Sequence, residues 1–224
     1  TSLVELDCSQ NELTALAMID LSLLEKVNCS GNQLTELDTR YCQGLKELNC
    51  ADNRLDTLSL IWEKSLVILD CSGNLLKSLR LTGNPALETL NCSGNQLTAL
   101  SVSSNTALTG LNCAKNQITQ LDLSKNTSLA SLDCSGNQLT NLDTSMMQFT
   151  QDLDCSDNLL TKLNMGNCSM LKNFSCLGNK LERLVFSQSG IYHVWGLYAD
   201  EGGYVGYVME QDEDGNCLLY TSDA

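Results

Sequence analysis

A repeat of 21 residues runs through most of this 224-residue chain and leaves few folds open to it. Cysteine recurs at that step nine times without insertion or deletion, at Cys8, Cys29, Cys50, Cys71, Cys92, Cys113, Cys134, Cys155 and Cys176. Asparagine follows each cysteine three residues later, and leucine or a similar residue fills further columns on both sides. A unit this short cannot bury an apolar face alone. The repeat therefore predicts a solenoid in which stacked turns share one core.

The local pattern within one repeat predicts a short strand and little or no α-helix. In residues 87–107, Leu90 and Cys92 alternate with polar residues, which is the period of a strand with one buried face. Val102 supplies a second inward contact on the return side. We expect nine right-handed turns over residues 1–189, with parallel strands spaced by about 4.8 Å.

The asparagine column has a mechanical explanation. An amide side chain inside a turn can satisfy backbone groups of its own loop and of the next rung. We therefore expect Asn95→Ala to destabilise the fold far more than Asn105→Ala, because Asn105 is interpreted as an ordinary turn residue.

The cysteine column is expected to consist of free, buried thiols that fill core volume. Side chains at the same position of neighbouring parallel strands point the same way, about 4.8 Å apart, whereas a disulfide needs Cβ atoms closer than about 4.5 Å and turned towards each other. A single column of thiols offers no tetrahedral metal site, and the column contains no CxxC pair. No metal or cofactor is predicted.

The repeat unit LxxLxCSGNQLTxLxxSxNTx, matched best by residues 87–142, resembles the cysteine-ladder leucine-rich repeat of internalin J and similar surface proteins of gut bacteria. The resemblance implies a right-handed solenoid, exported to the bacterial cell surface, that binds host or neighbouring ligands and can serve in adhesion. The chain departs from the pattern where Thr150 stands in a leucine column beside Phe149, which predicts a local bulge. It also departs where RYCQG and IWEKS replace the SxNTx corner of the second and third repeats.

The strand positions on either side of the inward leucine form one candidate binding face. Together these two columns hold seven acids and one base, Lys26. The candidate ligand-binding residues here are Lys26, Glu47, Ile68 and Asp70. An acidic face of this kind fits a basic or sugar-like ligand, and the alternative is that aspartate and asparagine belong to the repeat itself.

The corner after the convex segment is the second candidate. Tyr41 and Trp62 occupy one column in adjacent repeats, and Ile19 and Ile61 stand one position earlier, where other repeats have serine, glycine, lysine or asparagine. Exposed apolar groups mark interaction sites. The alternative is that they pack against a missing N-terminal cap or a neighbouring molecule. The chain begins at Thr1 inside the first repeat, so we expect missing residues or a neighbour to cover the N-terminal end of the core.

The segment after Ser189 differs from the repeats in its aromatic and acidic composition. Three strands are predicted there, at Ile191–Tyr198, Tyr204–Glu210 and Cys217–Thr221. Residues 190–224 would form an antiparallel meander that caps the last turn, or the start of a following domain.

Charge and motifs narrow the function class. A net charge of −14 argues against nucleic acid as a partner, and no apolar run is long enough to span a membrane. The chain has one histidine, His193, and no nucleophile, zinc or phosphate-loop motif, so we do not expect an enzyme. The sequence favours a module that binds a protein or a glycan. The alternatives are a structural spacer with no ligand and a non-catalytic fragment of a larger protein.

Overall fold

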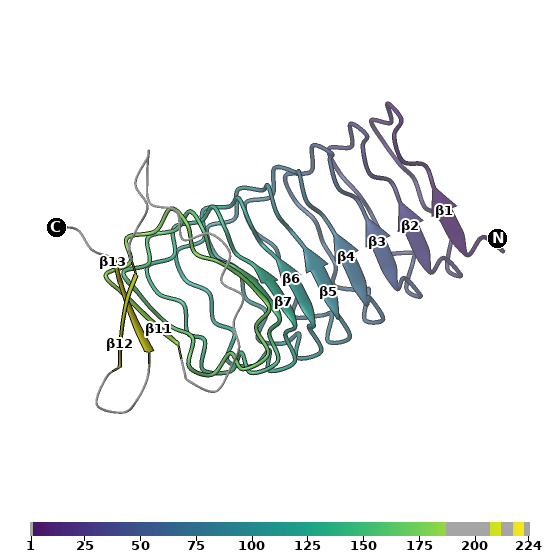
Figure 1. Ribbon diagram of the computed structural model, residues 1–224. Helices are drawn as coiled ribbons and strands as arrows, with labels where there is room; N and C mark the ends of the chain where they lie inside the picture. The colour runs from purple at the N-terminus through teal and green to yellow at the C-terminus, as the bar shows by residue number, and fades with distance from the viewer. Residues whose placement is uncertain (1, 187–206, 212–216, 222–224) are drawn as a thin grey trace.

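The computed structural model describes residues 2–186, 207–211 and 217–221, and this part of the chain contains no α-helix. Its repeats form a solenoid of about nine turns, called rungs, in which rung 1 is residues 3–23 and each later rung follows by 21 residues. Figure 1 shows the rungs stacked from the N-terminal end, with their strands aligned along one side. Those strands are β1 (Glu5–Asp7), β2 (Lys26–Asn28), β3 (Glu47–Asn49), β4 (Ile68–Asp70), β5 (Thr89–Asn91), β6 (Gly110–Asn112), β7 (Ser131–Asp133), β8 (Asp152–Asp154) and β10 (Asn173–Ser175). The solenoid prediction is confirmed.

The nine strands form one parallel sheet in chain order, and every pair is in register from one rung to the next. In each pair the middle residue of one strand lies beside the middle residue of its neighbour, as Leu90 does beside Leu111. Leucine and cysteine columns therefore become continuous core columns. Leu90, Cys92 and Val102 are fully buried, as the sequence predicted. In rung 1, by contrast, Leu6 and Cys8 are only partly buried.

The asparagine column is hydrogen-bonded on both the donor and the acceptor side. The Asn95 amide donates to the carbonyls of Cys92 and Ser93 in its own loop, at 3.1 and 3.2 Å. It also donates to the carbonyl of Cys71 at 3.0 Å, and its oxygen accepts the Leu76 backbone N–H at 3.0 Å. The expected link to the loop is present. The expected link to the next rung is wrong, because Cys71 and Leu76 belong to the preceding rung.

A second asparagine column runs along the corners, which corrects the interpretation of Asn105 as an ordinary turn residue. Asn105 is 0% exposed and donates to the carbonyls of Leu81 and Asn84 in the preceding rung, at 3.1 and 2.7 Å. The same two bonds recur at Asn84 and Asn126. The corner is therefore also tied from rung to rung by buried amides.

The cysteine column consists of buried free thiols. All nine cysteines of this column are unpaired, and among them only Cys8, at the open end, is not fully buried. Burial raises the pKa of Cys92 to about 12, so this thiol is neutral at physiological pH. The thiols thus serve as small apolar core residues.

The predicted bulge at Thr150 is absent. Strands β7 and β8 pair without a gap, and Thr150 is fully buried in the leucine column. Its hydroxyl donates to the carbonyl of Leu129 in the preceding rung at 2.9 Å. That hydrogen bond satisfies the polar group, so the backbone keeps the register of its neighbours.

A smaller sheet lies on the return side of the last rungs, in the order β12-β13-β11-β9. Its strands are β9 (Lys162–Asn164), β11 (Arg183–Phe186), β12 (Tyr207–Gln211) and β13 (Cys217–Thr221). β13 is antiparallel to both β11 and β12, as a meander requires, and β12 begins three residues later than predicted. The predicted strand at Ile191–Tyr198 lies outside the described residues, and the boundary at residue 189 stays a prediction. Within the described chain, only rungs 8 and 9 carry a strand on the convex side.

Candidate functional site

Most exposed apolar side chains of the described residues gather on one edge of the solenoid. We call this the corner edge and define it as residues 17–23, 38–44, 59–65, 80–86, 101–107, 122–128, 143–149 and 164–170. Eight of the thirteen exposed large hydrophobic residues lie there, in two groups. The N-terminal group is Ile19, Leu23, Tyr41, Ile61 and Trp62, and the C-terminal group is Met146, Phe149 and Met170. The rungs between the groups carry small or polar residues at the same places.

The backbone of the corner edge is fixed, which displays these side chains on a rigid support. In rung 2, Cys42 donates its backbone N–H to Thr39 and accepts the backbone N–H of Leu45, at 2.8 and 3.0 Å. In rung 3, the Glu63 carboxylate is fully buried and accepts the Trp62 backbone N–H at 3.0 Å. The Trp62 side chain beside it is nevertheless 53% exposed. Hydrogen bonds therefore hold the backbone of the turn, while its apolar side chains face the solvent.

All four corner residues expected from the sequence lie on this edge and are exposed: Ile19, Tyr41, Ile61 and Trp62. Sequence reasoning missed Leu23 in the same group and the whole C-terminal group. Phe149 was available as a signal, but it was interpreted as part of a bulge.

The expected residues of the concave face are brought together, but they are largely engaged with one another. Lys26 and Glu47 lie beside each other on β2 and β3 and form an ion pair of 2.9 Å, and Ile68 is next in the same column. The hydrogen bond and charge of Glu47 raise the pKa of Lys26. Asp70 accepts the backbone N–H of Ser72 and the side-chain amide of Asn91, at 3.0 and 3.1 Å. A ligand here would have to compete with these contacts.

The acidic face expected from the sequence includes a hollow further along, away from the four candidate residues. It has a volume of about 360 Å³ and lies over β7, β8 and β10. Three carboxylates line it, those of Asp133, Asp152 and Asp154. Asp133 and Asp154 are direct neighbours across the sheet, so like charges face the same opening.

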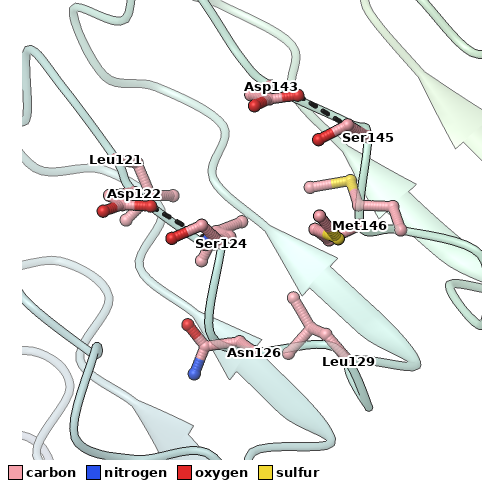
Figure 2. Close-up of a pocket in the computed structure, with 10 residues that line it drawn as sticks. Leu121, Asp122, Ser124, Asn126, Leu129, Asp143, Ser145 and Met146 are labelled. Atoms are coloured by element: carbon pink, nitrogen blue, oxygen red, sulfur yellow. Dashed lines mark hydrogen bonds between the residues drawn. The ribbon is translucent and has the colours of Figure 1, made fainter.

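The corner edge also has charged groups in equivalent places on successive rungs. Figure 2 shows Asp122 and Asp143 around a small pocket between rungs 6 and 7, with Met146 on its rim. Each carboxylate accepts the backbone N–H of the serine two residues later, Ser124 or Ser145, at 2.9 Å. These bonds lower the pKa of both carboxylates, which are therefore charged at neutral pH.

Among the described residues, no three or more histidine, cysteine, aspartate or glutamate side chains group in a way that could hold a metal ion. The same part of the chain includes no helix with the length and apolarity needed to cross a membrane.

No protein-family model matches the sequence, and no curated protein matches it. Several solved structures, in contrast, are similar to this chain. The functional domain of InlJ from Listeria monocytogenes, which includes a cysteine ladder, is 35% identical with a TM-score of 0.80, over 81% of this chain and 41% of that domain. A leucine-rich-repeat protein of Leptospira interrogans is 27% identical with a TM-score of 0.77, over 82% of this chain and 51% of its own. YopM from Yersinia enterocolitica is 28% identical with a TM-score of 0.70, over 86% of this chain and 42% of its own. The chain thus spans about half or less of the length of these structures.

Proposed function

Because the chain is a leucine-rich-repeat solenoid of the cysteine-ladder kind, similar to bacterial proteins, we propose that it is a protein-binding module without catalytic activity. We further propose that it belongs to an exported bacterial surface protein with a role in adhesion. The likeness to InlJ and to an internalin of Listeria monocytogenes supports this placement. The single observation that carries the binding proposal is the N-terminal apolar group of the corner edge.

The N-terminal group has the composition of a protein interface. Tryptophan and tyrosine contribute most to binding energy when a partner removes them from water. The solenoid itself does not need them, because rung 5 has a serine, Ser104, at the position equivalent to Trp62. A rigid backbone beneath these side chains lowers the entropy lost on binding. An exposed tryptophan with no use in the fold therefore favours a partner over a purely structural spacer.

The proposal is tested with three immobilised chains and extracts of surface proteins from bacterial and host cells. The chains are the wild type, Tyr41→Ser/Trp62→Ser and Leu75→Ser. Leu75 is a matched control because it is as exposed as Tyr41, 44% each, but lies away from the corner edge. We expect proteins retained by the wild type and by Leu75→Ser to be lost from the double variant. Equal retention by all three would overturn the corner edge as the binding surface, and the absence of any retained protein would leave the spacer.

A second candidate is favoured by the hollow over β7, β8 and β10. Its three carboxylates would attract a basic segment of a partner. Asp133→Asn/Asp154→Asn in the same capture experiment separates the two surfaces. Proteins lost from this variant and kept by Tyr41→Ser/Trp62→Ser would move the binding site to the concave face. A glycan array on the same variants tests carbohydrate as the ligand class.

A further inference from the structure

The two apolar groups of the corner edge lie at opposite ends of one line. Trp62 is in rung 3 and Met146 in rung 7, so four rung spacings, about 19 Å, separate them. Rung 5 lies midway and carries Ser101, Ser103 and Ser104 at the exposed places. Rung 5 is therefore the midpoint between the two apolar groups.

We infer that the corner edge binds a second copy of this chain, antiparallel, about a two-fold axis at rung 5. This inference rests on the proposal that the corner edge binds protein, and it names the partner. A two-fold axis across the edge reverses the order of rungs but keeps each column facing itself. Rung 3 of one copy then faces rung 7 of the other, rung 2 faces rung 8, and rung 4 faces rung 6.

Shape supports this register, because large side chains meet small ones in the same column. Phe149 would face Ser65, and Met170 would face Gly44. The one pair of large residues in a single column is Trp62 with Met146, and thioether–aromatic contacts are favourable. Tyr41, Ile61 and Trp62 of one copy would thus leave water together with Met146, Phe149 and Met170 of the other.

Charge supports the same register. Arg80 of rung 4 would face Asp122 of rung 6, twice in the dimer. Both side chains are exposed, and neither is part of an ion pair found within the described chain. A shift of the axis to between rungs 5 and 6 would oppose Arg80 to Asp143, a register that the Asp143→Arg variant distinguishes from the inferred one. A shift to between rungs 4 and 5 would instead oppose Asp38 to Asp143 and leave Arg80 facing a serine. Like charges in contact disfavour that alternative.

Sedimentation velocity over a concentration series tests the inference on the intact chain at physiological salt. We expect the sedimenting mass of the wild type to rise above the 24.4 kDa of the monomer as the concentration increases. Asp122→Arg and Arg80→Asp should each weaken the dimer by about tenfold or more, because each places like charges together at two points. The double variant Arg80→Asp/Asp122→Arg restores opposite charges and should recover association. Within one chain the two residues are two rungs apart, so a purely local role predicts no recovery.

Asp143→Arg is the matched control, because it removes the same serine hydrogen bond from the same column. In the inferred register Asp143 faces Ser59, so this variant should weaken the dimer much less than Asp122→Arg. A wild type that stays monomeric, or a dimer that the double variant does not recover, overturns the inference. Retention of a different protein in the capture experiment would still support the corner edge as a binding surface. If the chain neither self-associates nor retains a protein through the corner edge, the proposed function is contradicted too.

Discussion

The interior columns keep one residue type from rung to rung, whereas the exposed columns of the corner edge change residue at almost every rung. Cysteine fills its column in all nine repeats. The column of Tyr41 and Trp62, by contrast, continues with glycine, serine, lysine, methionine and asparagine. Stacking in register imposes the first behaviour, because each interior side chain touches its equivalents in the rungs above and below. At the edge the side chains face water, so variation there is free to serve a partner.

The difference also separates two kinds of stabilisation. Interior columns combine burial with hydrogen bonds that cross from one rung to the preceding one, as Asn95 and Asn105 do. The exposed apolar side chains of the corner edge add no such link, since Trp62 is hydrogen-bonded to its own turn through its backbone. Changes inside should therefore alter the free energy of unfolding, and changes at the edge should alter association.

The largest expected effect comes from titrating all the interior thiols together. An unfolded thiol ionises near pH 9, but in the fold burial raises the pKa of Cys92 to about 12. Above about pH 9 the unfolded state loses its proton first, so stability falls as pH rises, by about 1.4 kcal/mol per buried thiol between about pH 8 and about pH 10. Urea unfolding at both pH values should show this loss. Cys92→Ala should reduce the pH dependence, and Trp62→Ser should leave it unchanged. If the free energy of unfolding of Cys92→Ala fell with pH as steeply as that of the wild type, the account of the thiols would be contradicted.

A smaller effect distinguishes the two asparagine columns. Asn95→Ala removes one acceptor and three donor contacts and leaves the buried Leu76 N–H unsatisfied, which should cost about 3 kcal/mol. Asn105→Ala removes two contacts from a fully buried group and should cost about 2 kcal/mol. Thermal and urea unfolding of both variants measure the gap. A cost near zero for Asn105→Ala would mean that the corner column is not a structural link.

Much of the fold was predictable, because a repeat of fixed length specifies both the strand and the stacking. The positions of the cysteine, leucine and first asparagine columns followed directly from the 21-residue step. Asn105 was misjudged because a turn asparagine looks alike in sequence whether it faces solvent or the preceding rung. Thr150 was misjudged because the sequence does not show that the Leu129 carbonyl is within reach of its hydroxyl.

The candidate site was predictable only in part. Tyr41 and Trp62 stood out because they replace small residues in a regular corner. The C-terminal group was missed because a methionine within a repeat is usually a core residue. Met147 is indeed buried, but its neighbour Met146 is exposed. Which of two adjacent residues faces out depends on the turn geometry. The acids that line the hollow over β7, β8 and β10 belong to the predicted acidic columns, but the sequence did not show where along the sheet the hollow lies.

The smallest expected change in stability is also the most direct test of the contrast between interior and edge. Tyr41→Ser/Trp62→Ser should alter the free energy of unfolding by less than about 0.5 kcal/mol, as exposed substitutions usually do. The same variant should fail to associate in sedimentation velocity under conditions where the wild type and Leu75→Ser do. A loss of several kcal/mol in stability, comparable to that of Asn95→Ala, would contradict the account, because the aromatic corner would then belong to the structural core.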